Sequence, residues 1–475
     1  MTTQAMVSRA VAPFRWNVDR KVVWLALAAA VGLTLWFMPV MSGLTIAGQH
    51  ALAVVMFTVL LWITGATPAG VAALLLLAIV LCFIPEVKPA NFLGFWTQDT
   101  MWFILVCFVF SAIVETSGLG KRLTACVFSI RRLILIDLAL LGLNVLFDAL
   151  GMNASFPKLA LLFPLVTTVA LMSGMGKDHP YVRHLAILIN MLANLTGTLV
   201  YTGFVMNPAL GPLGGFKVNY AEWLQWFFVP ALVYTLICCV VIYFLFLPPR
   251  DAQFDPNIAR EQLKTIGPLT IAEKKTIVWL TIAVALWATG GITRLSTGYA
   301  AVLVAAAVLL PGIGVLTFKQ YVDKTDWNAV FMLMGVLAIG TLGPTGFAKW
   351  IWGHILPAQM PDSPMAALMI ISFLVELLHI PLGSVATSQA LAVPSLAEYA
   401  STFGASRALV SFITYLTIVG QQFFPYQNAA LVVGMGYGLW KPRDIFKLGS
   451  VMFIVTPITM GVVLYPWWLY LGWIH

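Results

Sequence analysis

A lysine interrupts an apolar stretch that runs from Leu133 to about Leu171. Lys158 follows a break in this stretch with the sequence Gly-Met-Asn-Ala-Ser-Phe-Pro. A charged side chain is costly inside a membrane and is usually kept there for function. Two roles are open. The ammonium group either faces a bound anion or replaces a bound cation, or it forms a structural ion pair with Asp148, ten residues earlier.

Gly, hydroxyl and amide residues break four apolar stretches in a similar way. Interrupted helices expose N–H groups that suit an anion, and carbonyls and hydroxyls that suit a cation such as Na⁺. The alternative is that small polar residues only let helices pack closely. The candidates in the first half are Asn153, Ser155, Thr196, Thr198, Thr202, Gly203 and Asn207. Those in the second half are Ser384, Thr387, Ser388, Gln421, Gln422 and Asn428.

Two further ionisable residues, Glu376 and His379, share a helix face because they are three positions apart. A proton relay is one interpretation, since His titrates near neutral pH. A buried structural hydrogen bond between the two is the favoured one.

The composition indicates that the protein that contains these residues is a membrane protein. Of 475 residues, 61% are hydrophobic and 9% are charged. A soluble domain has about a quarter charged residues. Apolar segments of about 16 to 25 residues match the length that a helix needs to cross a bilayer. The five cysteines lack the spacing of a zinc site or disulfide framework.

An all-α polytopic membrane protein with about 11 transmembrane helices is therefore expected. Scaffold spans are predicted at residues 1–99 and again at 277–327. Between these two scaffold regions lie a first repeat at 100–247 and a cytoplasmic linker at 248–276. The second repeat and the last span occupy 328–475. Re-entrant hairpins are predicted at about 133–171 and 364–400, and interrupted spans at about 184–214 and 406–438.

Basic residues orient this topology. With the N-terminus in the cytoplasm and the C-terminus outside, 20 of the 26 Lys and Arg residues fall inside and five fall outside. The excess follows the positive-inside rule, and it favours a multi-pass protein of a bacterial-type inner membrane. The net charge of +8 is explained in this way, and no nucleic-acid partner is indicated.

An internal repeat relates the two halves. Ser-Gly-Leu-Gly-Lys at 117–121 matches Thr-Gly-Phe-Ala-Lys at 345–349, and Pro164 and Asn207 match Pro394 and Asn428. The topology places the two copies on opposite sides of the membrane, so the repeats are inverted. Inverted repeats with paired broken helices are typical of secondary transporters, whose site lies near the bilayer midplane.

The chain resembles the divalent anion/sodium symporter (DASS) family. Thr-Gly-Thr-Leu-Val-Tyr-Thr-Gly-Phe-Val-Met-Asn at 196–207 is similar to the motif in the family's first interrupted span, and Pro-Tyr-Gln-Asn at 425–428 occupies the second such position. Gly-Tyr-Gly-Leu-Trp-Lys-Pro-Arg-Asp at 436–444 resembles the turn before the last span. The hairpin tips depart from the family's Ser-Asn-Thr, with Ala154-Ser155-Phe156 in the first and Ser384 followed by later hydroxyls in the second.

The resemblance implies a substrate site and cation sites at the tips and breaks. Expected substrate-binding residues are Asn153, Ala154, Ser155, Lys158, Ser384, Val385, Thr387, Ser388 and Pro425. Expected Na⁺-binding residues are Asn153, Ser155, Thr198, Thr202, Gly203, Asn207, Ser384, Gln421 and Asn428. Na⁺ is the only metal expected, with no transition metal and no cofactor.

The predicted function is secondary active transport of a small anion by an elevator-like movement, and the family resemblance implies a homodimer. Na⁺-coupled uptake of di- or tricarboxylates is favoured, ahead of sulfate or a sulfonate. Anion exchange, H⁺ symport, and an arsenite-type permease or cation antiporter are the alternatives. An intramembrane enzyme or receptor is disfavoured, because the sequence contains no Walker loop, HExxH motif or nucleophile elbow.

Overall fold

The computed structural model describes residues 20–474, apart from residues 131, 153–154, 177, 250–254, 358–359, 401–403, 425–426, 429–430, 432–433 and 436. All regular elements in this part of the chain are helices. An isolated bridge between Ala405 and Ile474 is the one β contact described outside them.

Helices of the first half follow the predicted order of spans, hairpin and interrupted span. They are α1 (Arg20–Phe37), α2 (Ile46–Thr64), α3 (Ala69–Phe83), α4 (Pro89–Phe92), η1 (Gly94–Thr97), α5 (Asp99–Ser117), α6 (Leu119–Phe128), α7 (Leu133–Ala149), α8 (Ser155–Met172), α9 (Pro180–Leu195), η2 (Thr196–Thr198), α10 (Asn207–Gly214) and α11 (Tyr220–Leu245).

The second half begins with the linker helix. Its elements are α12 (Pro256–Ile266), α13 (Ile271–Ala288), α14 (Gly290–Thr293), α15 (Thr297–Val308), α16 (Phe318–Lys324), α17 (Trp327–Thr341), η3 (Gly343–Thr345), α18 (Phe347–Ile355), α19 (Pro364–Leu382), α20 (Val385–Glu398), α21 (Arg407–Gly420), α23 (Pro442–Ile458), the π-helical turn η6 (Thr459–Val463) and α24 (Tyr465–Tyr470).

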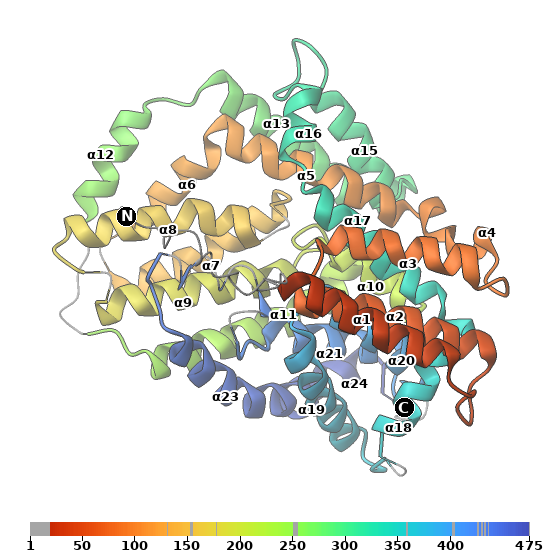
Figure 1. Ribbon diagram of the computed structural model, residues 1–475. Coiled ribbons are helices and arrows are strands. Elements are labelled where there is room, and N and C mark those ends of the chain that lie inside the picture. Colours follow the sequence, from red (N-terminus) through yellow and green to blue (C-terminus); the bar gives the residue numbers. More distant parts are fainter. Residues whose placement is uncertain are drawn as a thin grey trace, which may run out of the picture.

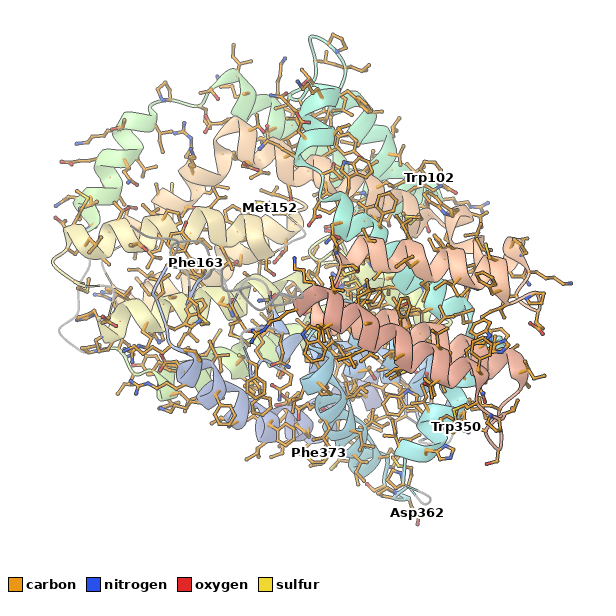
Figure 2. The ribbon with its side chains drawn as sticks, in the orientation of Figure 1. Trp102, Met152, Phe163, Trp350, Asp362 and Phe373 are labelled. Carbon is orange, nitrogen blue, oxygen red and sulfur yellow. The ribbon has the colours of Figure 1, made fainter. Side chains whose placement is uncertain are left out.

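Seven helical segments in the described residues are long and apolar enough to cross a membrane. Four shorter apolar helices accompany them. Large apolar side chains such as Phe37, Phe83 and Phe244 are exposed on the outside of these helices. Figure 2 shows the outward side chains around the whole molecule. An apolar outer surface of this kind suits a lipid environment.

Two groups of helices lie apart in the view of Figure 1. Helices α1, α2, α3 and α17 pack together on one flank, and α5 packs against α13 and α15. The first hairpin helices α7 and α8 lie with α6 and α9 on the other flank. The division into a scaffold and a moving part remains a prediction that rests on this element order.

The repeated five-residue motif makes the same backbone turn in both halves. Gly118 ends α5 with φ 88° and ψ −3°, and Gly346 ends η3 with φ 83° and ψ −3°. Glycine adopts this left-handed conformation without the steric cost of a Cβ atom. An amphipathic helix, α6 or α18, starts directly after each turn. The opposite membrane orientation of the two copies remains a prediction.

Two predicted spans have different ends in the structure. The span expected at about 298–316 is helical only through Val308, because Pro311 and Gly312, with φ 81°, terminate α15. The last span starts earlier than the expected residue 450. Pro442 opens α23, where the Asp444 carboxylate accepts from the backbone N–H of Lys441 at 2.9 Å, and a π-helical turn with Pro466 after it separates α23 from α24.

The linker is fastened to the first repeat by a paired guanidinium and carboxylate. Arg122 on α6 donates from Nε to Glu273 Oε1 at 2.7 Å and from Nη2 to Glu273 Oε2 at 3.0 Å. It also donates to the carbonyl of Gly267 at 2.8 Å. The hydrogen bond from Arg122 holds the pKa of Glu273 down, at about 2. Glu273 lies before the span expected from residue 277, in the polar linker.

We expect Glu273→Gln to lower the melting temperature at neutral pH, since it removes the charged partner of Arg122. A lowered carboxylate pKa stabilises the folded state above the ordinary pKa of 4.5 and loses its effect as pH falls toward about 2. The difference in melting temperature between wild type and variant should therefore be constant from pH 7 to about 5 and shrink below pH 5. A gap that persists undiminished at acid pH would contradict this assignment. Thermal unfolding across this pH range provides the measurement.

Candidate functional site

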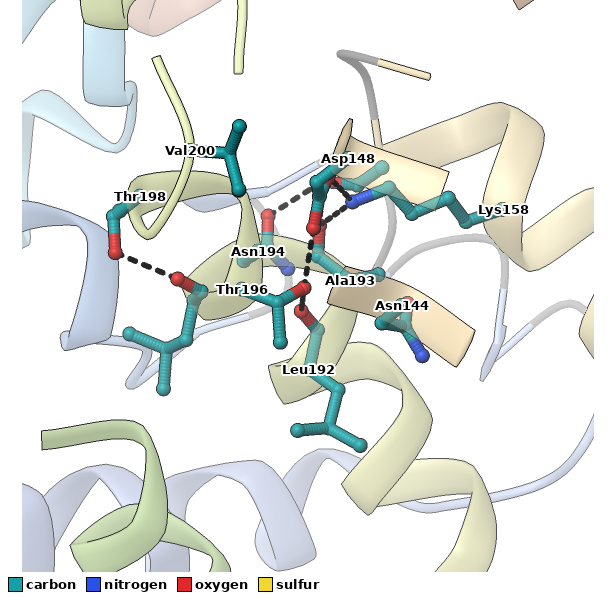
Figure 3. A network of polar contacts seen from close by, with 12 residues as sticks. Asn144, Asp148, Lys158, Leu192, Ala193, Asn194, Thr196, Thr198 and Val200 are labelled. Atoms are coloured by element: carbon teal, nitrogen blue, oxygen red, sulfur yellow. Dashed lines mark hydrogen bonds and ion pairs between the residues drawn. The ribbon is translucent and has the colours of Figure 1, made fainter. Parts of the chain in front are cut away.

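The tip of the first hairpin contains a buried ion pair. Lys158, on α8, contacts Asp148 Oδ1, on α7, and donates to the carbonyl of Ala193, on α9, at 3.1 Å. The side chains of Lys158 and Asp148 are 1% and 0% exposed. Figure 3 shows the ammonium group next to Asp148 and Ala193. The structural ion pair with Asp148 is thus present. The same ammonium group also contacts the first interrupted span, at Ala193.

Asp148 joins the hairpin to the unwound part of the first interrupted span. Its Oδ2 accepts a hydrogen bond from Thr196 Oγ1 at 2.6 Å. Its backbone carbonyl accepts one from Thr202 at 3.3 Å. A Cβ atom on Gly203 would lie 2.8 Å from Cβ of Asp148, so only glycine permits this approach. Asp148 therefore positions two of the threonines singled out in the sequence and packs against the glycine between them and Asn207.

Asn194 connects the two halves of the chain. Its Oδ1 accepts hydrogen bonds from Ser155 Oγ and from Asn428 Nδ2, each at 2.7 Å. Its Nδ2 donates to the carbonyl of Asn190, one turn earlier, at 2.7 Å. Asn190 in turn donates to Gln422 Oε1 at 2.9 Å. The first hairpin tip and both interrupted spans thus meet at one buried amide.

Asn207 ties down the non-helical backbone after α9. Its Nδ2 donates to the carbonyls of Gly197 at 2.7 Å and Val200 at 2.8 Å. Its Oδ1 accepts a hydrogen bond from the hydroxyl of Tyr415, on α21. Exposed backbone at membrane depth needs such partners, because an unsatisfied group there costs several kcal/mol. Asn207 therefore acts as a structural bridge in this conformation.

The second hairpin tip is built from hydroxyls and an imidazole. Ser384 caps α20 by accepting from the backbone N–H of Thr387 at 3.4 Å. His379 Nδ1 lies 2.7 Å from Ser388 Oγ, across the tip. The favoured hydrogen bond between His379 and Glu376 is wrong, because both carboxylate oxygens of Glu376 lack a hydrogen-bond partner in the described residues. The hairpin also reaches the first half, where Gln389 donates to the carbonyl of Met206 at 3.4 Å.

Several side chains of the second hairpin and of the break after α21 bury polar atoms without a hydrogen-bond partner in the described residues, among them Gln389 Oε1 and both carboxylate oxygens of Glu376. Thr387 Oγ1 and both Oε1 and Nε2 of Gln421 are also of this kind. Both residues are fully buried. Unpaired buried polar groups are costly, which makes them candidates for contact with a ligand. A cluster of three or more His, Cys, Asp or Glu side chains fit for a metal ion does not occur in the described part of the chain.

Most of the predicted site residues lie where these elements converge. Ser155, Lys158, Thr202, Gly203, Asn207 and Asn428 belong to the connected network, and Ser384, Val385, Thr387, Ser388 and Gln421 lie at the second tip and break. Thr198 Oγ1 donates to the carbonyl of Leu195 at 2.6 Å and closes the end of α9. Asn153, Ala154 and Pro425 lie outside the described residues.

The sequence analysis did not single out Asn190, Asn194, Gln389 or Tyr415. Asn190 and Asn194 are four residues apart and so occupy one face of a buried apolar helix. That spacing is a usable signal, because buried amides in an apolar span need partners. Gln389 and Tyr415 carry no such signal in sequence, since their partners are Met206 and Asn207 in the other half.

Residues 19–474 match the profile of the sodium:sulfate symporter transmembrane region. The chain belongs to the divalent anion/sodium symporter family. This membership agrees with the family that the motifs resemble, and it makes the protein a multi-pass membrane transporter of small anions, not an enzyme.

Relatives of this symporter-family member carry names of carboxylate transporters. It is 25% identical over 78% of its length to a Shigella dysenteriae protein, of which 79% is covered, named L-tartrate/succinate antiporter. It is 22% identical over 95% of its length to the Escherichia coli citrate/succinate antiporter, of which 97% is covered. The Alcanivorax borkumensis YdaH transporter has a similar fold, with a TM-score of 0.50, 15% identity, and coverage of 95% of this chain and 97% of that one.

Proposed function

We propose that this protein is a secondary active transporter of small di- and tricarboxylates. The observation that carries the proposal is the meeting of both hairpins with both interrupted spans in buried hydrogen-bonded contacts, through Asn194 and Asn428 and through Gln389 and Met206. Four discontinuous segments that converge in this way form the binding site of inverted-repeat transporters. The carboxylate transporters named among the relatives support this substrate class.

The substrate carboxylates bind at the starts of α8 and α20. Free backbone N–H groups at a helix N-terminus attract anions. The hydroxyls of Ser155, Ser384 and Ser388 stand within the first turn of these helices or next to it. One helix start comes from each half, so we assign one substrate carboxylate to each.

Na⁺ is the proposed coupling ion, and it binds at the second half. Thr387 and Gln421 supply oxygen atoms there that lack partners in the described residues. Oxygen ligands from hydroxyl, amide and backbone carbonyl groups suit a hard monovalent cation. No cofactor is required.

Transport proceeds by an elevator-like movement of the hairpins and interrupted spans against a scaffold that includes α1 to α3. We place the protein in a bacterial-type inner membrane as a homodimer, with its N-terminus in the cytoplasm and its C-terminus outside. The excess of Lys and Arg in the segments expected inside supports this orientation.

Uptake of labelled succinate by purified protein in liposomes tests the proposal. We expect uptake that is driven by an inward Na⁺ gradient and that unlabelled malate or citrate competes away. Sulfate and sulfonates in the same panel test the neighbouring anion classes. Absence of uptake with every carboxylate, from folded protein and under both Na⁺ and counter-anion conditions, would overturn the substrate class.

Anion exchange is the second candidate. The fixed Lys158 ammonium and the antiporters named among the relatives favour it. Liposomes preloaded with succinate but without Na⁺ separate the two mechanisms. Uptake that needs internal succinate and no Na⁺ would establish exchange.

A further inference from the structure

We propose that the Lys158 ammonium is a built-in cation that fills one of two related cation positions, so that only the second-half position takes a mobile ion. This inference rests on the proposed function, because it assigns the coupling ions of the same site. Three observations carry it: the oxygen surroundings of the ammonium, its place at a helix C-terminus, and the different chemistry of the corresponding position in the second half.

Two oxygen atoms contact the ammonium, and both are of types that also bind a monovalent cation. The Asp148 carboxylate and the Ala193 carbonyl contact Nζ directly. Thr196 Oγ1 holds the other carboxylate oxygen in place at 2.6 Å. Both charged side chains are fully buried, so the carboxylate needs a permanent positive partner.

Ala193 lies in the last turn of α9, which ends at Leu195. Carbonyl groups in the last turn of a helix lack intrahelical donors and carry the negative end of the helix dipole. In transporters with broken spans, such half-helix ends coordinate the coupling cation. Lys158 delivers its charge to this place from the neighbouring hairpin. The ammonium is buried and already paired with Asp148, which argues against direct substrate binding in this conformation.

The corresponding place in the second half holds neutral groups. Lys158 is the fourth residue of α8, and Ser388 is the fourth residue of α20. Lys158 pairs across its tip with Asp148, whereas Ser388 contacts His379 across the other tip. Next to this second contact, Gln421 follows the end of α21 with its side-chain amide unpartnered in the described residues. One half thus contains its own cation, and the other retains free ligand atoms.

Removing the ammonium while keeping Asp148 should create a place for Na⁺. We would measure the melting temperature of purified Lys158→Ala in NaCl and in choline chloride at equal ionic strength. Na⁺ should raise its melting temperature by about 3 °C more than that of the wild type, in a saturable manner. The double variant Asp148→Asn/Lys158→Ala should lose this additional response, because no carboxylate remains to hold the ion.

Lys324→Ala is the matched control. It removes a lysine that pairs with Glu115 at 2.8 Å, but these side chains are 33% and 52% exposed. Its Na⁺ response should equal that of the wild type. The proposal is overturned if Na⁺ raises the melting temperatures of wild type and Lys158→Ala equally. It is also overturned if the double variant responds to Na⁺ as strongly as Lys158→Ala does, or if Lys158→Ala folds in neither salt.

Transport gives a second readout that separates this inference from the proposed function. Succinate transport by Lys158→Ala should depend on Na⁺ concentration with a Hill slope about one higher than that of the wild type. If no carboxylate is transported by the wild type, the proposed function fails, but the melting measurement still decides the role of Lys158, because it uses no substrate.

Discussion

Asn194→Ala is expected to reduce carboxylate transport at least about tenfold and to destabilise the protein by about 2–4 kcal/mol. The variant removes one acceptor for Ser155 and Asn428 and one donor to the carbonyl of Asn190. Asn194 is 4% exposed, so water does not readily replace these partners. Each buried group left without a hydrogen bond costs about 1–3 kcal/mol. Transport falls because the first hairpin tip loses its fixed position relative to both interrupted spans.

Asn144→Ala, on α7 of the first hairpin, provides the matched control for Asn194 on α9. Asn144 is fully buried like Asn194, but its described hydrogen bond runs only to the carbonyl of Leu140, one turn earlier, at 2.9 Å. We expect a stability loss of at most about 1 kcal/mol and transport close to wild type. Thermal unfolding and initial rates of succinate uptake are the measurements. Equal effects of the two variants on uptake would refute a special role of Asn194.

The architecture could be predicted because apolar length and breakers dominate it. The first hairpin was expected at about 133–171, and its helices span Leu133–Ala149 and Ser155–Met172 around a Gly-containing break. Boundaries failed where local chemistry outweighed hydropathy. Pro311 and Gly312 end α15 although the apolar run continues, and Pro442 with the Asp444 carboxylate on the N–H of Lys441 starts α23 before the apolar run begins.

The site was predictable in its residue types but not in its connections. Hydroxyl and amide residues at breaks indicated where ligands could bind, and Lys158 stood out because charge is rare at membrane depth. The hydrogen bond between Asn194 and Asn428 joins residues 234 positions apart, and no local pattern predicts that contact. His379 and Glu376 share a helix face, yet the packing of α20 against α19 turns the imidazole to Ser388.

Gln421→Met is expected to raise the melting temperature and, in the same protein, to abolish Na⁺-driven uptake. The wild-type amide is buried, and neither of its polar atoms has a hydrogen-bond partner in the described residues. Replacing it with an apolar side chain of similar length removes a desolvation cost of about 1–3 kcal/mol. Residues kept for ligand binding often stabilise the folded protein when they are replaced, at the expense of activity.

Gln49→Met is the control, because the melting temperature should change in the opposite direction there. Gln49 is also buried, but its side chain accepts from the N–H of Met41 at 2.9 Å and donates to the carbonyls of Leu35 and Met38 at 3.0 and 2.9 Å. The same substitution there should lower the melting temperature, because it leaves those backbone groups without partners. Opposite signs at the two glutamines, with uptake lost only at Gln421, would mark the Gln421 amide as a ligand for the transported ion. A melting temperature that falls at both positions would instead mean that Gln421 is bonded within the fold, and the Na⁺ position would have to lie elsewhere.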